Sequence, residues 1–363
     1  MLLLQIDWAF ILEKLILIAI ILGVSFGVAA YATWGERKVA AVMQDRIGPH
    51  RAGPFGLLQP LADGLKLFFK EEIIPDRSTR TLFILAPAMF MLTALMTSAV
   101  IPWGPDILTE NGKISLQVAD INIGILYIFG VVSVGVYGIM LGGWASNNKY
   151  SLLSSIRAAS QAISYELALG LSLIALLMAT GSLSMAEIVR QQHGFWSDGW
   201  FTWYFFKQPL GFLIFLVCSF AELNRAPFDM PEAESELNMG YHLEYSSMKL
   251  GMFLFAEYIN MFITSAVLAT LFFGGYNFPF MDNVAAWLQD VLPNAHSAVF
   301  ALICVLVLMT KIIGFILFFM FIRWTLPRFR YDQLMNLGWK SLIPLALVNM
   351  IITGAVILWV FKN

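Results

Sequence analysis

Seven long stretches of this chain contain no aspartate, glutamate, lysine or arginine, and they constrain its fold more than any other feature. A bilayer core about 30 Å thick needs roughly 20 apolar residues for each helix that crosses it, and each stretch is at least that long. We therefore predict transmembrane helices over Leu15–Trp34, Thr81–Pro105, Ile121–Asn148, Leu167–Ala186, Tyr258–Met281, Val291–Thr310 and Ser341–Phe361.

A further apolar stretch is interrupted by a single charge. Lys207 separates Trp200–Phe206 from Gln208–Ala221, and a lysine can reach the membrane surface while its stem stays in the apolar layer. Counting this weaker stretch gives about eight spans and places 16 of the 22 Lys and Arg residues in the odd-numbered loops. Basic residues accumulate on the cytoplasmic side. We therefore predict that both termini lie outside and that the loops near 35–80, 145–160, 222–249 and 323–340 are cytoplasmic.

The composition agrees with an all-α, polytopic protein that forms a single membrane domain over residues 1–363. Only 13% of the residues are charged, about half the fraction of a typical soluble domain. No Rossmann or P-loop glycine pattern follows a strand, so we expect this chain not to bind nucleotides. We also expect no nucleic-acid partner. Cys218 and Cys304 lie inside predicted spans without a C-x-x-C pattern. This favours buried thiols, and we predict no metal site in this chain.

The first cytoplasmic loop contains an amphipathic pattern. Pro60 suits the first turn of a helix, and apolar residues follow at helical spacing: Leu57, Leu58, Leu61, Leu65, Phe68 and Phe69. The pattern predicts a helix that lies on the membrane surface. A helix packed on a soluble partner subunit would give the same pattern, and the two arrangements are compatible.

The third cytoplasmic loop is strongly acidic. It contains only two basic residues, Arg225 and Lys249. Its six acids are Glu222, Asp229, Glu232, Glu234, Glu236 and Glu244. Pro227 and Pro231 interrupt helical continuity there. The excess of acids favours a role in proton exchange over a set of structural ion pairs.

Three acids lie at or within the predicted spans. Glu166 begins the fourth span, Glu222 closes the fifth, and Glu257 follows Lys249 by eight residues inside the sixth apolar region. Ionisable groups in a span usually face the protein interior or a water cavity. We expect them to exchange protons or to form ion pairs between helices. Lys311, also within a span, would neutralise one acid or relay a proton.

Four segments resemble one family in order and spacing. They are Gly35–Leu67, Gly143–Tyr150 followed by Ser164-Tyr165-Glu166, Ala221–Leu237 followed by Glu244-Tyr245-Ser246, and Arg323–Leu334. Together they resemble the NADH dehydrogenase subunit 1 family, which includes the H subunit of bacterial NADH–quinone oxidoreductase, respiratory complex I. The resemblance covers nearly the whole chain. One departure is His50 in the first-loop turn, where the family commonly has Asn.

The resemblance implies a membrane subunit that forms part of the quinone chamber and couples quinone reduction to proton translocation. It places one set of residues at the quinone cavity: Glu36, Arg37, Arg46, Asp63, Arg225, Phe228 and Asp229. It places a second set in an acidic funnel towards proton channels: Glu166, Glu222, Glu232, Glu234, Glu236, Glu244 and Glu257.

The resemblance also implies the partners and the location. Quinone would be the substrate, while NADH, flavin and iron–sulfur clusters would be bound by partner subunits and no cofactor by this chain. The expected partners are the soluble subunits that carry the terminal iron–sulfur cluster, antiporter-like membrane subunits and the lipid of the bacterial plasma membrane. Two alternatives stay open at this point: a membrane subunit of a ferredoxin-linked hydrogenase, and a stand-alone ion transporter.

Overall fold

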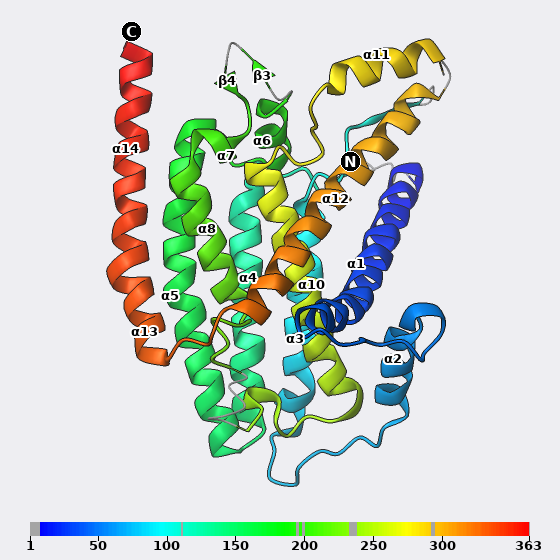
Figure 1. Cartoon of the computed structure of the whole chain (residues 1–363), viewed down its shortest axis with the longest axis vertical. Coiled ribbons are helices and arrows are strands. Elements are labelled where there is room, and N and C mark those ends of the chain that lie inside the picture. The colour runs from blue at the N-terminus through cyan, green and yellow to red at the C-terminus, as the bar shows by residue number, and fades with distance from the viewer. Residues whose placement is uncertain are drawn as a thin grey trace, which may run out of the picture.

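The described part of the chain folds as a helical bundle with two short hairpins (Figure 1). The computed structural model describes residues 8–109, 112–193, 196–197, 200–231, 238–291 and 295–362. The helices are α1 (Trp8–Met43), α2 (Gln59–Phe69), α3 (Arg80–Thr97), α4 (Gly124–Ala145), α5 (Lys149–Thr180), α6 (Met185–Gln191), α7 (Tyr204–Lys207), α8 (Pro209–Glu222), α10 (Ser247–Phe272), α11 (Met281–Val291), α12 (His296–Thr325), α13 (Tyr331–Asn336) and α14 (Ile343–Lys362). The antiparallel hairpins pair β1 (Ile107–Thr109) with β2 (Gly112–Ile114), and β3 (Trp196–Ser197) with β4 (Trp200–Phe201).

Seven of the described helical segments are long and apolar enough to cross a membrane. They overlap the seven uncharged stretches, so the prediction of a polytopic helical membrane protein is confirmed. The weaker eighth stretch folds differently from a single long helix. Its first two residues belong to β4, α7 has four residues, and α8 has 14, which gives α8 a length of about 21 Å.

Several helices continue beyond the uncharged stretches that predicted them. α5 begins at Lys149, well before the predicted start of its span, so Glu166 lies near the middle of this helix and not at its beginning. Most of the predicted loop 145–160 is therefore helical. A buried row of small residues explains the extension, because Ser151, Ser154 and Ala158 let neighbouring segments pack closely against this part of α5.

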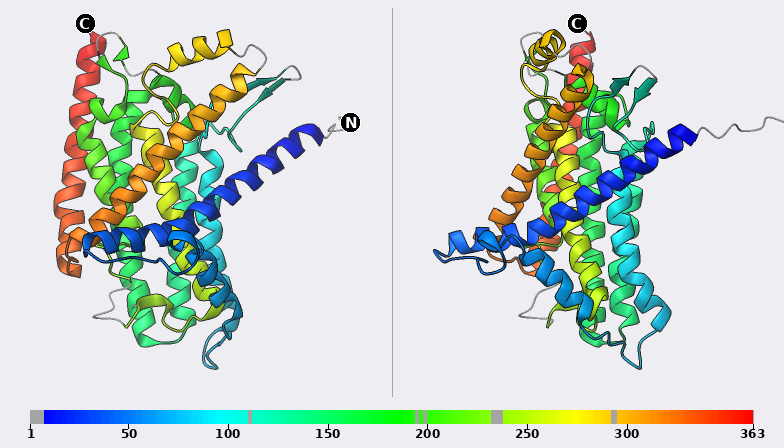
Figure 2. Two further views of the ribbon diagram at one scale, coloured as in Figure 1. Left: turned by 45° about the vertical axis from the view of Figure 1, so that its right-hand side comes forward. Right: turned by 90° about the vertical axis from the view of Figure 1, so that its right-hand side faces the viewer.

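α1 is the longest helix and carries part of the site at its inner end. It has 36 residues, which corresponds to about 54 Å and exceeds the thickness of a bilayer core. Figure 2 shows that α1 is strongly inclined to the helices α3, α4 and α5. Its apolar residues continue without a break into the charged sequence Gly35-Glu36-Arg37, so the same helix crosses the apolar layer and delivers Glu36 to the interior.

The core of the bundle forms around α10, which packs against α1, α3 and α12. α3 and α4 lie close together because glycine lines their contact. A Cβ atom at Gly138 would come within 2.9 Å of the Phe90 backbone nitrogen. Small residues of this kind allow helices to approach closely inside a membrane, where exclusion of water gives no driving force for helix association.

The connecting segments gather at two opposite ends of the bundle. α6, α11, the strands β3 and β4 and the C-terminal end of α14 lie at one end, while α2 and the turn between α4 and α5 lie at the other (Figure 1). α2 begins with Pro60 in its first turn, as predicted, and exposes Phe68 and Phe69. The predicted amphipathic helix of the first loop is therefore present.

Lys311 of α12 binds backbone carbonyls. Its ammonium donates to the carbonyl oxygens of Phe273 (2.7 Å), Gly275 (2.8 Å) and Asn277 (2.5 Å), and it lies 4.6 Å from the centre of the Trp203 ring. These carbonyls follow the C-terminal end of α10, where the helix dipole favours a cation. Lys311 thus caps α10 by binding carbonyl oxygens, and it forms no ion pair with an acid among the residues that the structure describes.

Candidate functional site

A buried carboxylate, Glu36 of α1, lies at the centre of the site. Arg225 donates to its Oε2 at 2.8 Å, the hydroxyl of Tyr258 donates to the same oxygen at 2.8 Å, and Arg323 donates to Oε1 at 2.5 Å. Glu36 and Arg225 are each 6% exposed. Glu36 comes from α1, Arg225 from the segment that follows α8, Tyr258 from α10 and Arg323 from α12. These four residues form the charged cluster, which joins four distant parts of the sequence.

The groups around Arg225 hold it in its charged form. The guanidinium of Arg225 also stacks on the Tyr258 ring, 4.2 Å from its centre. Burial disfavours the charged guanidinium, but Glu36 and, more weakly, Tyr258 and Glu257 outweigh burial and raise the pKa of Arg225. Arg225 therefore stays charged and lies under the influence of acids from two helices, α1 and α10.

The next residue of α1, Arg37, points to a different partner. It donates to Asp63 Oδ2 of α2 at 2.6 Å, and Lys66 lies 3.5 Å from the other oxygen of that carboxylate. Consecutive positions on a helix point about 100° apart, so Glu36 faces the interior while Arg37 holds α2. Arg46, by contrast, is exposed and donates to Gln44 at 2.7 Å. The structure thus brings Arg37 and Asp63 together and leaves Arg46 outside this contact.

The segment after Arg225 packs against the region that follows α12. The Phe228 ring lies 5.5 Å from Tyr165 and 5.5 Å from Phe329, and Asp229 forms an ion pair with Arg328 at 3.0 Å. Phe228 is buried, as is Asp229. These contacts fix the segment that carries Arg225 between α5 and the residues that connect α12 to α13.

An apolar groove opens between α1, α2, α3 and α10. Its volume is about 640 Å³, and its lining includes Tyr31, Leu61, Leu65, Met91 and Phe255. Few polar atoms line it. The groove ends close to the charged cluster, because Phe255 lies one helical turn before the tyrosine that binds Glu36.

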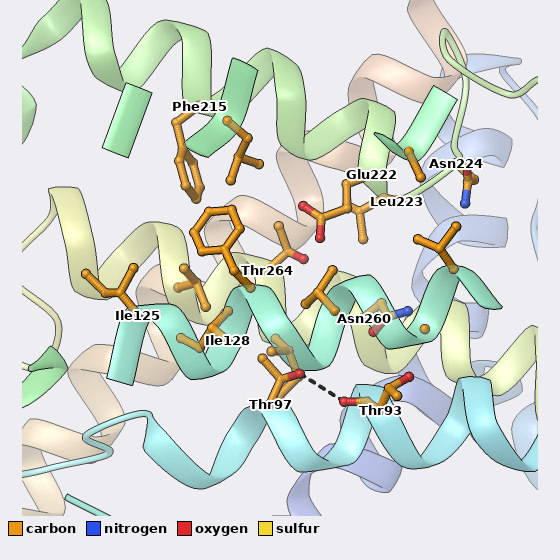
Figure 3. A pocket seen from close by; sticks show the side chains of 18 of the residues that line it. Thr93, Thr97, Ile125, Ile128, Phe215, Glu222, Leu223, Asn224, Asn260 and Thr264 are labelled. Atoms are coloured by element: carbon orange, nitrogen blue, oxygen red, sulfur yellow. Dashed lines mark hydrogen bonds between the residues drawn. The ribbon is translucent and has the colours of Figure 1, made fainter. Parts of the chain in front are cut away.

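A second, smaller cavity lies inside the bundle, between α3, α4, α5, α8 and α10 (Figure 3). It provides about 80 Å³ of space for water. Glu222 lines one part of it, together with the polar side chains of Thr93, Asn260 and Thr264, whereas Phe215 and other apolar residues line the rest. Glu222 thus reaches an internal space that also contains neutral hydrogen-bonding groups.

The remaining predicted acids accept hydrogen bonds from neutral side chains. These pairs are Glu166 with the hydroxyl of Ser133, Glu244 with Asn148 at 2.7 Å, and Glu257 with Tyr241 at 2.9 Å. Glu166 also acts electrostatically on Glu222. The described acids thus come from α5, α8, α10 and the segment that precedes α10. Glu232, Glu234 and Glu236 lie outside the residues that the structure describes.

Two members of the charged cluster, Arg323 and Tyr258, are absent from the site residues that the sequence predicted. Arg323 begins the last of the four segments that carry the family resemblance, and Tyr258 directly follows Glu257. Each offers a signal in retrospect. Arg323 is a charge in the last turn of a 30-residue apolar helix, and Tyr258 is a polar-tipped side chain in an apolar run, where it needs a hydrogen-bond partner.

No group of three or more His, Cys, Asp or Glu side chains that could hold a metal ion occurs within the described ranges. Cys218 and Cys304 are buried free thiols, as predicted.

Comparison with known proteins places this arrangement in a family. A family model described as NADH dehydrogenase matches residues 15–354. The NADH-quinone oxidoreductase H subunit 1 of Cytophaga hutchinsonii is 58% identical over 354 residues, 98% of this chain and 99% of the relative. The H subunit of Flavobacterium johnsoniae is 59% identical over 350 residues, 96% of each chain. The H subunit of Thermomicrobium roseum is 47% identical over 356 residues, 97% of this chain and 98% of the relative.

The fold defines a multi-pass helical membrane protein with a buried charged cluster. More particularly, the chain belongs to the NADH dehydrogenase family, in the branch represented by the H subunit of NADH-quinone oxidoreductase, an enzyme complex of several subunits. The family predicted from the four sequence segments is confirmed.

Proposed function

We propose that this chain forms part of the chamber through which quinone enters the enzyme complex, and that it couples quinone reduction to proton translocation. The observation that carries this proposal is the position of the apolar groove beside the Glu36 cluster. Quinone has a long apolar tail and a polar head. The groove of about 640 Å³ suits the tail. The hydroxyl of Tyr258, one turn further along α10, and the guanidinium of Arg225, which binds the same Glu36 oxygen, suit the head.

Proton coupling rests on the distribution of the acids. Reduction of a quinone to a quinol consumes two electrons and two protons, so the local charge changes during the reaction. Arg225 responds to both Glu36 and Glu257, and Glu222 lies three residues before Arg225, at the edge of the internal cavity. In this proposal, the set of acids that exchange protons in response to that change of charge is Glu166, Glu222, Glu244 and Glu257, with Glu232, Glu234 and Glu236.

The proposal includes the placement of the chain. About eight spans, with α8 as the shortest, would put both termini outside and the four basic loops in the cytoplasm of a bacterium. The NADH, flavin and iron–sulfur sites would belong to soluble partner subunits, and antiporter-like membrane subunits would carry the protons onward. The gathering of the connecting segments at two opposite ends of the bundle supports this placement (Figure 1).

A bulky side chain in the groove tests quinone access directly. Gly251 lines the groove, and a Cβ atom there would contact Leu67 of α2 at 3.3 Å. In the assembled complex, Gly251→Phe should raise the KM for a long-tailed quinone, while NADH oxidation with a hydrophilic artificial acceptor stays normal. Gly27→Phe is the matched control, because Gly27 lies on α1 and faces another groove, between α1 and α12. Equal KM values in both variants and the parent complex would contradict the proposal.

A further inference from the structure

Gln161 of α5 is a buried amide whose function the family membership does not explain. Its side chain is fully buried. Its Nε2 donates to the carbonyl oxygen of Ala221 at 2.7 Å and to that of Phe228 at 2.8 Å, and it lies 3.3 Å from Asn224 Oδ1. Within the described part of the chain no donor contacts its Oε1. The orientation of the amide is therefore set by the acceptors around its nitrogen.

The two carbonyls that Gln161 binds enclose a short segment of the site. Ala221 directly precedes Glu222, which lines the internal cavity. Phe228 follows Arg225 by three residues, and Arg225 binds Glu36. The amide of Gln161 thus binds both ends of the segment 221–228. This segment joins Glu222, at the internal cavity, to Arg225, in the charged cluster.

The enclosed segment is a tight turn that depends on such support. The backbone nitrogen of Phe228 donates to the carbonyl of Arg225 at 2.9 Å. Asn224 has a φ of 52°, in the left-handed region, which asparagine adopts more readily than most residues. Without the two N–H donors of Gln161, the buried carbonyls of Ala221 and Phe228 would each lose a donor, and the Ala221 carbonyl would keep the longer bond from the backbone nitrogen of Asn224, at 3.3 Å. The turn would then relax, and Arg225 would move relative to Glu36.

We propose that Gln161 is a positioning residue for quinone reduction. It fixes the distance between the backbone of Glu222 and that of Arg225, and so holds the guanidinium where the quinone head is bound. It acts through Arg225 and does not touch the quinone. This inference rests on the proposed function and extends it to a residue outside the charged cluster. A merely structural link between α5 and α8 would lower the amount of assembled complex and leave the KM for quinone unchanged.

Two variants of the assembled complex separate these roles. Gln161→Met keeps the length of the side chain and removes both donors, so the KM for a long-tailed quinone should rise about fivefold to tenfold, as expected for one or two lost hydrogen bonds. Gln161→Glu regains one O–H donor when its carboxyl is protonated. Its KM should therefore be lower than that of Gln161→Met at acidic pH, and the difference should shrink as pH rises. All rates are divided by NADH oxidation with a hydrophilic acceptor, which counts assembled complexes.

Gln208→Met is the matched control. Gln208 is another buried glutamine, and its Nε2 donates to the carbonyl oxygen of Ala175 in α5 at 2.9 Å. This contact lies away from the segment that carries Arg225. Its replacement should leave the KM unchanged. The proposal is overturned if Gln161→Met has the parental KM, if Gln208→Met raises the KM equally, if the two Gln161 variants show the same KM at every pH, or if neither assembles.

Arg225→Met distinguishes a failure of the positioning role from a failure of the proposed quinone site. If it raises the KM and Gln161→Met does not, the positioning role of Gln161 is wrong and the quinone site stands. If Arg225→Met itself leaves the KM unchanged in assembled complexes, the proposed quinone site is wrong.

Discussion

Arg225 donates a hydrogen bond to Glu36 over 2.8 Å, although 189 residues separate the two in the chain. This contact ties the inner end of α1 to the segment that follows α8. Both side chains are buried, and a buried ion pair that loses one partner leaves an uncompensated charge. The pair therefore links the helix that borders the apolar groove to the region that carries the acids, and substitutions of its members should have large effects.

Glu36→Gln should strongly impair the complex. It removes the charge that balances Arg225 and Arg323, and breaking a buried ion pair typically costs about 3–5 kcal/mol. We expect a loss of quinone reductase activity of at least about tenfold per assembled complex, or a clear loss of assembly. The measurement is NADH:quinone activity beside NADH oxidation with a hydrophilic acceptor. Glu13→Gln, the same change near the other end of α1, should have little effect, and parental activity in Glu36→Gln would count against the cluster.

Tyr258→Phe isolates a single hydrogen bond. The ring that stacks under Arg225 remains, and only the hydroxyl that donates to Glu36 is lost. A hydrogen bond to a charged group contributes about 1.5–3 kcal/mol, so the KM for quinone should rise by roughly tenfold or more. Tyr127→Phe, which removes an exposed hydroxyl bound to the Met96 carbonyl at 3.3 Å, is the control. Identical KM values for both variants would remove Tyr258 from the site.

Glu222→Gln should reduce the number of protons pumped for each NADH oxidised. The substitution keeps the shape of the side chain at the internal cavity and removes its ability to exchange a proton. The same loss is expected when Glu234 and Glu236 are both changed to Gln. The measurement is proton uptake in vesicles that contain the complex. Glu187→Gln alters a half-buried acid of α6 that pairs with Arg190 and should pump normally. Unchanged pumping in all the acid variants would argue against proton coupling through this chain.

Lys311→Met should lower the stability of the complex without altering its proton stoichiometry. The ammonium binds three carbonyls after α10, and hydrogen bonds to charged groups contribute about 1.5–3 kcal/mol each. Thermal inactivation should therefore occur at a lower temperature, while assembled complexes pump the normal number of protons per NADH. A fall in that number at unchanged stability would instead favour the proton relay that the sequence alone left open.

The uncharged stretches predict the helices well, because a helix that crosses a bilayer needs a minimum number of consecutive uncharged residues. They predict helix ends less well. α1 continues through Glu36 and Arg37, and α5 begins at Lys149, because charged residues can stay helical where other helices provide ion pairs or where the helix leaves the apolar layer. Nothing in the local pattern distinguishes these helical charges from loop charges.

Part of the candidate site can be predicted from the sequence, through the segments that carry the family resemblance. Glu36, Arg225 and Asp229 were named from the family resemblance, and the structure buries all three. That Arg225 and Arg323 share one carboxylate is a consequence of how α1 and α12 pack. Such long-range packing leaves no periodic signal in the sequence. For the same reason, the sequence does not predict the contact of Gln161 with the carbonyls of Ala221 and Phe228.

The most direct test of the proposed quinone chamber is an experimental structure of the assembled complex with a long-tailed quinone bound. We predict that the tail lies in the groove lined by Leu65 and Phe255 and that the head lies within reach of the cluster formed by Glu36, Arg225 and Tyr258. A quinone bound elsewhere, with lipid filling this groove, would contradict the proposal.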